Sequence, residues 1–413
     1  MDGPMDTKLL PTNTYSLKNN SILLRETVNT MKYNINICGF LLVVLISCQN
    51  EGAEVLVEAE SFDVKGGWVV DHHAFPKISS AYLMANGRGE PVKDARTRVK
   101  FPVEGIYHVF VSTYNWTSPW YKGNGPGSFQ IIVDGSPLKN TLGNSGSRWE
   151  WQYAGKVKVG KEVELALHDL AGFNGRADAV YFSKRKAGPP ADYIQGRVFR
   201  NKLLGHEEPN QPPEADLVVV GAGTAGMTAA LTAARLGLSV TLINNRPVLG
   251  GNNSPEVGVT LSGLMNKNLY PRLGNVLREI SGIPIPEDSH REPYYYRGKG
   301  HGKPTKLGSD RKTAELRMKI FTEEENINLY LNTHVFDVKM DGSRISAVLG
   351  KNILTGKETI FRGKLFADCT GDGDLGYHAG ADYHIGREAR SFANESIAPA
   401  ESDQKKMGTT LSW

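Results

Sequence analysis

The chain has 413 residues and a formal net charge of +4 at pH 7. This length exceeds what one hydrophobic core usually serves, so two folded domains are expected. Hydrophobic residues make up 40% and charged residues 22%, and there is no long basic block, so the composition does not point to nucleic acid as a partner. The three cysteines, Cys38, Cys48 and Cys369, form no CxxC pair. This argues against a disulfide framework, a zinc site or an iron–sulfur cluster, so an electron carrier would have to be organic.

The amino terminus has the pattern of a targeting segment. Residues 1–30 are polar and without a steady period, and we assign them no structure; Met31 is then the expected start of translation. In residues 31–48, Lys32 precedes an apolar run from Ile35 to Ser47. This run is shorter than the roughly 20 residues of a membrane helix, and it fits the core of a secretory signal.

The end of that run, Leu45-Ile46-Ser47-Cys48, resembles the lipobox of bacterial lipoproteins. The resemblance implies lipidation of Cys48, a membrane anchor, and a place in a bacterial cell envelope, on the periplasmic side or the outer-membrane surface. The alternative interpretation is a buried strand with a chance cysteine.

Residues 54–186 contain short stretches of strand length in which the residues are apolar or alternate between apolar and polar. Examples are "EVLVEAESF", "GSFQIIVDGSPL" and "RADAVYFSK". The turn pairs Asn86-Gly87 and Asp134-Gly135 separate some of these stretches. No convincing amphipathic helical window interrupts them. The pattern predicts a β-sandwich, or jelly roll.

The pieces "VEAESF", "EGIYHVFVSTYNW" and "LHDLAGFNGRADAVYF" resemble carbohydrate-binding jelly rolls of the golvesin and xanthan-lyase binding-domain type. The loop that follows the central piece places Trp116, Trp120 and Tyr121 beside glycine and proline. Flat aromatic faces stack on the C–H faces of sugars, so these rings either form a polysaccharide site or cover the end of the sandwich. Trp149 and Trp151 would share one face of a strand, and they are expected to be core residues or to cover the ends of the sandwich rather than to bind sugar. The domain could equally serve only as a spacer.

Residues 187–214 read as a linker. They contain Pro189-Pro190 and Pro212-Pro213 and have no steady period, which is typical of a domain boundary. A short helix is expected over Tyr193 to Leu204.

The second domain, residues 215–413, opens on "LVVVGAGTAGMTAALTAARLGLSVTLINN", from Leu217 to Asn245. A buried strand, a glycine-rich turn, a helix from Thr224 to Leu236 and a second strand follow one another. The glycines fit GxGxxG, and Thr224 and Ala225 begin the helix, whose amino end favours phosphate. The pattern predicts an α/β, Rossmann-like dinucleotide site whose turn residues are Gly221, Gly223 and Gly226.

The second strand ends in Asn244, where such folds usually carry a carboxylate for the adenosine ribose. An amide oxygen still accepts a hydrogen bond there, without the charge. The continuation from Arg246 to Gly250 and Gly251 is similar to the "LGG" that follows this strand in FAD-binding oxidoreductases. In those proteins the double glycine lets the backbone pass close to the cofactor.

A third match lies downstream, where "FADCTGDG" resembles the "ATGDG" strand–turn of the same family and places Thr370 and Gly371 at the cofactor. The segment before it, from Ile327 to Asp368, reads as an inserted β-meander with turns at Asp341-Gly342 and Thr355-Gly356. In related flavoproteins a strand like that at Val335 meets the adenine through its backbone.

Three matches in the family's order make residues 216–387 similar to the FAD-dependent oxidoreductase family that also contains the flavin subunit of heterodisulfide reductase. The resemblance implies FAD as cofactor. The iron–sulfur cysteines of that relative are absent from this sequence, so a ferredoxin-like partner bound through clusters is not implied.

The sequence assigns no catalytic base and no metal ligand. His301, in a loop with Tyr294 to Tyr296, is either part of a substrate lid or a surface residue. Asn252, Asn253 and Ser254 either bond the flavin ring or substrate, or serve the turn. Cys369 is expected to lie in a buried strand as an inert thiol.

The leading hypothesis is an envelope-anchored FAD-dependent oxidoreductase that oxidises a carbohydrate or a related hydroxylated compound by hydride transfer to flavin. After residue 387 little chain remains for a substrate region, so the domain is expected to be incomplete at its carboxyl end. The alternative is a polysaccharide-binding envelope lipoprotein with a truncated, non-catalytic flavin fold. A third hypothesis, a polysaccharide (xanthan) lyase, finds no catalytic residues in the sequence.

Overall fold

The computed structural model describes residues 53–205, 208–261, 263–265, 270–283, 294–296 and 309–406, which belong to one structural unit. The expected signal segment (31–48), the lipidation site Cys48 and His301 lie outside the described residues. Among the helices that the structure describes, none is both long and apolar enough to cross a membrane.

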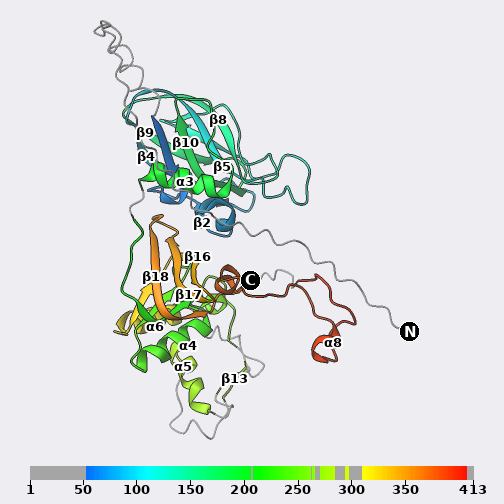
Figure 1. The fold of residues 1–413 in the computed structure, drawn as a ribbon. Helices are drawn as coiled ribbons and strands as arrows, with labels where there is room; N and C mark the ends of the chain where they lie inside the picture. The colour runs from blue at the N-terminus through cyan, green and yellow to red at the C-terminus, as the bar shows by residue number, and fades with distance from the viewer. Residues whose placement is uncertain are drawn as a thin grey trace, which may run out of the picture. The chain divides into compact units, whose positions relative to one another are not determined.

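The first fold consists of two antiparallel sheets (Figure 1). The larger has the order β2-β3-β10-β5-β8, with β1 also paired to β10; the smaller has the order β4-β9-β6-β7. The strands are β1 (Glu54–Glu58), β2 (Trp68–Asp71), β3 (Tyr82–Asn86), β4 (Ala95–Lys100), β5 (Gly105–Thr113), β6 (Phe129–Val133), β7 (Ser136–Pro137), β8 (Glu150–Val159), β9 (Glu162–Asp169) and β10 (Phe173–Ser183). A 3-10 turn, η1 (Ala59–Ser61), follows β1, and a short helix, α2 (Phe75–Ile78), lies between β2 and β3.

The core of this fold lies between the two sheets. Phe129, Ile131 and Val133 alternate along β6 and are all buried, and the Phe129 ring meets Trp68 edge-on at 5.7 Å. Side chains that alternate in this way line one face of a strand. The two-layer β-sandwich that the sequence predicts is therefore present. The elements β2, α2 and β3 were not predicted, because β2 is only four residues long and β3 does not alternate.

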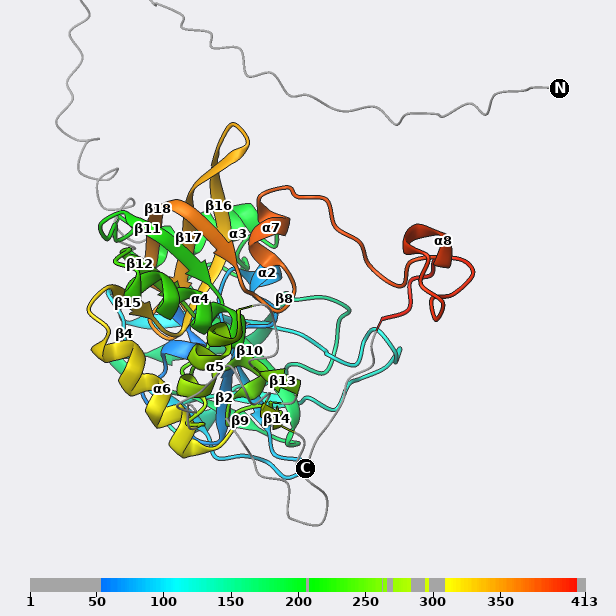
Figure 2. The same ribbon diagram turned by 90° about the horizontal axis from the view of Figure 1, so that it is seen from below.

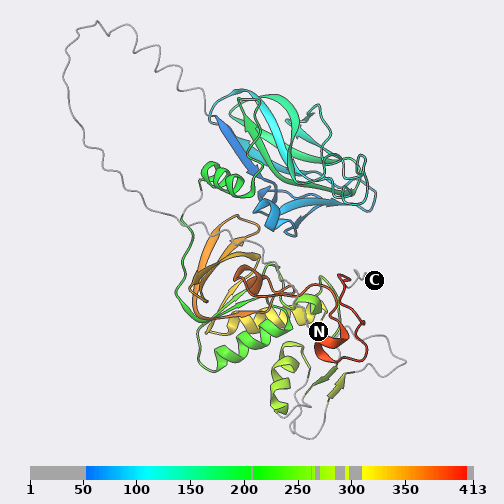
Figure 3. The same ribbon diagram turned by 45° about the vertical axis from the view of Figure 1, so that its right-hand side comes forward.

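The expected linker helix is confirmed as α3 (Tyr193–Leu204). Asp192 caps its amino end by accepting a bond from the Gln195 amide at 2.9 Å. Apolar residues of α3 pack on the outer face of the larger sheet, against Tyr181 and beside Trp151 (Figures 1 and 3). Trp149 packs against Tyr82, with ring centroids 5.1 Å apart. Both tryptophans are partly buried and pack against other side chains outside the core between the sheets, so they cover the sandwich and are not core residues.

A buried ion-pair cluster joins α3 to the sandwich. Arg200, 5% exposed, donates to Glu58 at 2.8 Å, to Ser80 at 2.8 Å and to both carboxylate oxygens of Asp178. Glu60 lies beside them, and one of its oxygens has no hydrogen-bond partner among the described residues. Burial raises the pKa of both glutamates, while Arg200 opposes this at Glu58. The guanidinium thus supplies the positive charge within a group of three carboxylates.

The second fold is built on a sheet of order β15-β12-β11-β18-β17-β16 (Figures 1 and 2). Strands β15, β12, β11 and β18 pair in parallel, and β18 continues into an antiparallel ladder with β17 and β16. The strands are β11 (Ala215–Val220), β12 (Val240–Ile243), β15 (Ile327–Tyr330), β16 (Thr333–Asp341), β17 (Arg344–Asn352) and β18 (Glu358–Asp368). The expected meander is correct for β16 to β18 and wrong for Ile327–Tyr330. That segment is β15, which pairs in parallel with β12 and forms the edge strand of the parallel part of the sheet.

Helices cover one face of the parallel strands β12 and β11, and the antiparallel ladder of β16, β17 and β18 folds over the other face (Figures 1 and 3). Along β11, Val219 faces the helices, whereas Val218 and Val220 face the side chains of β16, β17 and β18. Such a strand is buried on both faces and therefore reads as a continuous apolar run. The helices are α4 (Thr224–Arg235), α5 (Gly274–Ile280), α6 (Arg311–Glu323), α7 (Asp374–His378) and α8 (Arg390–Ala393); the short elements are η2 (Gly251–Asn253), η3 (Pro271–Leu273), β13 (Gly263–Met265) and β14 (Tyr294–Tyr296).

The Arg200 cluster yields a stability prediction. Arg200→Ala leaves buried carboxylates without their cation, so the free energy of unfolding should fall by about 3–5 kcal/mol at pH 7, measured by denaturant titration. Because burial raises the pKa of Glu58 and Glu60, protonation relieves the uncompensated charge, and the loss should shrink as the pH is lowered towards 4.5.

The matched control is Arg185→Ala. Arg185 is exposed and forms a surface ion pair with Glu54 at 3.7 Å. Its replacement should therefore lower the free energy of unfolding by less than about 1 kcal/mol. Similar small losses for the two variants would show that the cluster does not hold α3 on the sheet.

Candidate functional site

At the glycine turn after β11, two backbone segments lie in close contact. Gly221 has φ +98, and a Cβ built on it would lie 2.3 Å from the carbonyl oxygen of Cys369. A Cβ on Gly226 would lie 1.8 Å from the carbonyl oxygen of Gly221. Both positions therefore require glycine for close backbone packing. Gly226 brings α4 onto the strand, as the sequence pattern predicts.

Gly223 differs from its two neighbours. It caps the amino end of α4 in extended backbone, and a Cβ built there meets no atom within 4 Å. The residue is thus open on the side that a ligand would occupy. The free amides of the first turn of α4 follow it directly, and such amides bind phosphate oxygens.

A second segment, the loop after β12, packs against this turn. Gly250 forms an isolated bridge with Gly223, and its amide donates to the Ala222 carbonyl at 2.9 Å. Gly250 and Gly251 both have positive φ, of +125 and +57. A Cβ on Gly251 would lie 3.1 Å from the Gly223 Cα. The double glycine is therefore needed for the approach of two backbone turns.

The third segment begins where β18 ends. The Cys369 amide donates to the Val220 carbonyl at 2.8 Å, which places Thr370 and Gly371 beside the glycine turn. The Thr370 hydroxyl donates to Asp368 at 2.7 Å and accepts from the Asp374 amide at 2.9 Å. This bonding fixes the turn that leads into α7.

The three segments enclose a cavity of about 620 Å³. This is within the range of ligand sites. Its lining includes every expected cofactor-binding residue except Gly226, namely Gly221, Gly223, Thr224, Ala225, Asn244, Arg246, Gly250, Gly251, Val335, Thr370 and Gly371. It also includes Asn245, Asn252, Asn253, His334 and Asp372, among others. Residues from distant parts of the sequence thus meet at the carboxyl ends of parallel strands, where open α/β sheets bind ligands.

Asn244 is 6% exposed, and its amide group is bonded largely to backbone. The side-chain nitrogen donates to the carbonyls of Arg246 and Val248, at 3.2 and 2.9 Å, and the side-chain oxygen lies 3.4 Å from the Ala222 amide. A carboxylate offers no donor for those two carbonyls. The amide at this position therefore holds the loop after β12 in place while it lines the cavity.

Arg317 is a residue of this site that sequence reasoning missed. It lies in α6, is fully buried, and donates to the backbone and side-chain oxygens of Asn253 and to the Ile280 carbonyl. Burial lowers its pKa to about 10, so it remains charged at neutral pH. A Cβ on Gly250 would lie 2.4 Å from its guanidinium. The only signal in the sequence was an arginine within an amphipathic helix, a pattern typical of an exposed residue.

The other residues that the sequence suggests for the site have different surroundings. Asn252 and Asn253 both line the cavity. Asn252 is exposed, whereas Asn253 is buried and donates to the Val259 carbonyl at 2.8 Å, as expected of a turn residue. The buried Ser254 hydroxyl has no hydrogen-bond partner among the described residues. Tyr294–Tyr296 form β14, paired with β13.

Cys369 lies just beyond β18 and is half-buried, so its expected place within a buried strand is wrong. The strand ends one residue earlier, because the chain turns there towards the cavity. Burial and the nearby Asp368 raise the pKa of its thiol. A raised pKa disfavours the reactive thiolate.

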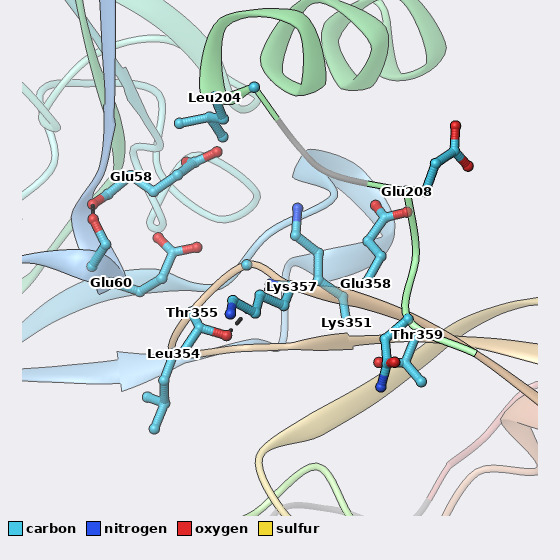
Figure 4. A pocket seen from close by; sticks show the side chains of 14 residues that line it. Glu58, Glu60, Leu204, Glu208, Lys351, Leu354, Thr355, Lys357, Glu358 and Thr359 are labelled. Atoms are coloured by element: carbon cyan, nitrogen blue, oxygen red, sulfur yellow. Dashed lines mark hydrogen bonds between the residues drawn. The ribbon is translucent and has the colours of Figure 1, made fainter. Parts of the chain in front are cut away.

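A second cavity, of about 600 Å³, is lined by Glu58, Glu60, Lys351 and Glu358, among others (Figure 4). One oxygen of each of these three glutamates has no hydrogen-bond partner among the described residues. The first cavity differs from this one because it combines glycine turns, the amides at the amino end of a helix and open space at Gly223, which are the features that bind a dinucleotide.

The glycines give a matched pair of variants. In Gly223→Val the new side chain projects into open space, so the fold should survive while FAD affinity falls at least tenfold, about 1.4 kcal/mol. In Gly226→Val the side chain meets the Gly221 carbonyl, and the free energy of unfolding should fall by about 1–3 kcal/mol. Denaturation of the ligand-free protein and flavin fluorescence titration measure the two effects. Unchanged FAD affinity in Gly223→Val would contradict the site.

Asn244→Asp tests the role of the amide. The substitution removes two donors and sets a carboxylate against two carbonyls, so we expect the free energy of unfolding to fall by about 2–4 kcal/mol and FAD affinity to fall with it. Asn124→Asp, at an exposed position of the sandwich, adds the same charge and should change neither quantity. Tighter FAD binding by Asn244→Asp would instead mean that this position serves mainly the ribose.

Comparisons with known proteins agree with this geometry. Residues 216–410 match the model of a family described as FAD dependent oxidoreductase. A digeranylgeranylglycerophospholipid reductase from Picrophilus torridus is 28% identical over 130 residues, which cover 32% of this chain and 33% of that protein. A second such reductase, from Methanothermobacter thermautotrophicus, is 29% identical over 163 residues, which cover 38% and 36%. The chain spans about a third of the length of these curated relatives.

Similarity to solved structures is distant. THI4 from Thermovibrio ammonificans is 18% identical with a TM-score of 0.31, over 50% of this chain and 80% of that one. A family 35 carbohydrate binding module from Clostridium thermocellum is 16% identical with a TM-score of 0.26, over 32% and 98%. Relation to heterodisulfide reductase or to golvesin stays a prediction. The family match and the curated relatives make residues 216–410 similar to FAD-dependent oxidoreductases and support FAD as the cofactor.

Proposed function

We propose that this protein is a FAD-dependent oxidoreductase that oxidises a carbohydrate or a related hydroxylated compound. The observation that carries the redox part is the cavity at Gly223, where two glycine turns and the end of β18 meet at the amino end of α4. When bound, FAD supplies the hydride acceptor. The chain itself contributes backbone amides for the phosphates, and the buried Arg317 fixes the loop at Gly250.

The carbohydrate part rests on the loop after β5. Trp120 is 79% exposed and Tyr121 is 60% exposed, so their ring faces are open to a ligand. Trp116 is held in place, since its indole nitrogen donates to the Phe173 carbonyl at 2.9 Å and its ring lies 5.6 Å from the Arg176 guanidinium. Exposed rings on an anchored loop are suited to stacking on sugars.

The same exposed rings favour one alternative. In it the chain is a polysaccharide-binding lipoprotein whose flavin fold does no chemistry. In both versions the proposal includes a lipid anchor at Cys48 and a place in a bacterial cell envelope, as the amino-terminal pattern predicts.

The experiment is an anaerobic reduction of the purified, full-length protein. We expect flavin absorbance in the purified protein, and bleaching when the correct sugar is added, because hydride transfer removes the oxidised flavin. Gly223→Val should show neither signal. Flavin that no hydroxylated compound bleaches would contradict the carbohydrate substrate.

A parallel arm measures retention of the protein in polysaccharide gels. Trp120→Ala should weaken retention about tenfold through lost ring stacking, while flavin content stays unchanged. Retention that is unchanged in this variant would contradict a sugar site at Trp120. A wild type that no sugar polymer retains would contradict both carbohydrate proposals.

A further inference from the structure

Part of the sandwich is buried against the nucleotide-binding fold next to the cofactor cavity. Phe75, in α2, is 1% exposed, and its ring packs on two side chains of β16. The ring centroids lie 4.5 Å from His334 and 5.7 Å from Phe336. Phe75 is thus covered by side chains of the other fold.

His72 makes the second contact. The side-chain nitrogen of Asn245 lies 3.0 Å from His72 Nε2. An amide nitrogen only donates, so His72 Nε2 must be the unprotonated, accepting nitrogen. Burial, together with Arg246, lowers the pKa of His72 to about 4, and burial with His72 lowers that of His334 to about 3. Both rings are therefore neutral at pH 7, which for His72 is the state that its hydrogen bond with Asn245 requires.

The residues that the sandwich holds belong to the cofactor cavity. Asn245 and His334 both line it. Asn245 follows Asn244 at the end of β12, which is where an adenosine ribose binds in folds of this kind. None of the described residues of the sandwich lines the cavity. The sandwich can therefore affect a bound cofactor only indirectly, through the positions of Asn245 and His334.

Further bonds fix the same surface. Lys351, 3% exposed and paired with His334 across the β16–β17 ladder, donates to the Ser79 carbonyl at 3.0 Å. Arg197 of α3 bonds Glu358 at 3.0 Å and lies 4.6 Å above the Phe336 ring. The contact is therefore a built interface that spans β16, β17 and β18.

We propose that the sandwich is a structural part of the FAD site. His72 and Phe75 are positioning residues that hold Asn245 and His334, so that FAD binds tightly only while the sandwich is docked. This inference rests on the proposed function, in that it concerns the same cofactor.

The test is FAD affinity of the full-length protein, measured by flavin fluorescence. We expect His72→Ala and Phe75→Ala each to weaken FAD binding at least fivefold. His73→Ala is the matched control, since His73 is the exposed neighbour on the same segment, and it should bind FAD as the wild type does. Circular dichroism verifies that each variant is folded.

A pH profile separates positioning from general damage. Because the docked state lowers the pKa of both histidines below the ordinary 6.5, the undocked state takes up protons more readily, and docking weakens as the pH falls from 6.5 towards 4. FAD affinity of the wild type should fall over this window. His72→Gln keeps an acceptor and cannot be protonated, so its profile should be flatter and its affinity at pH 7 close to the wild type. The charged and titratable groups around the two rings are Asp71, His73, Arg197, Arg246, Lys351 and His378.

The outcomes distinguish this inference from the proposed function. If the wild type binds no FAD, the proposed function fails. If the wild type binds FAD and the His72 and Phe75 variants bind it as tightly as His73→Ala, the inference is overturned and the proposed function stands. A double-mutant cycle of His72→Ala with Asn245→Ala on the free energy of unfolding gives a further readout, independent of FAD. A coupling indistinguishable from zero would also overturn the inference.

Discussion

Backbone packed directly against backbone, at the turn after β11, is the constraint on which the site depends. Gly221 lies against the carbonyl of Cys369, Gly226 against that of Gly221, and Gly251 against Gly223. A side chain at 221 or 226 would overlap one of these carbonyl oxygens. The crowding places three segments, separated by as many as 150 residues, around one cavity. It also leaves Gly223 as the open position, which is why the amino end of α4 is available to a phosphate group.

Two buried arginines stabilise different parts of the molecule by different chemistry. Arg200 lies among carboxylates and ties the linker helix to the sandwich. Arg317 bonds to neutral oxygens of Asn253 and Ile280, beneath the loop that bears Gly250. The first compensates buried negative charge. The second brings positive charge close to the loop that borders the cofactor cavity, where an anionic cofactor would benefit from it.

The linker and the sandwich are more than a tether. Residue Asn210 of the linker exchanges backbone bonds with Glu358 and Ile360 of β18, at 3.0 and 2.8 Å. Helix α3 lies on the larger sheet of the sandwich and also bonds β18 through Arg197. The sandwich is therefore placed against the ladder that carries His334. This arrangement brings the sandwich next to residues that line the cofactor cavity.

The sequence by itself determined the elements with strong local patterns. These are the glycine turn with its strand and helix, the double glycine, the end of β18, helix α3 and most strands of the sandwich. Each is encoded by neighbours along the chain: apolar runs, glycine at positions of positive φ, and capping residues. All the predicted cofactor residues except Gly226 line the cavity, because these motifs fix the backbone locally, and their contact with FAD stays a prediction.

Only the tertiary structure decided the rest. It placed Ile327–Tyr330 in the parallel sheet, turned the Asn244 amide towards two carbonyls, and buried Arg317 and Arg200. It also set His72 against Asn245, 173 positions apart in the chain. The physical reason is that burial, charge compensation and strand pairing depend on which distant segment fills the adjacent space, and no local periodicity carries that information.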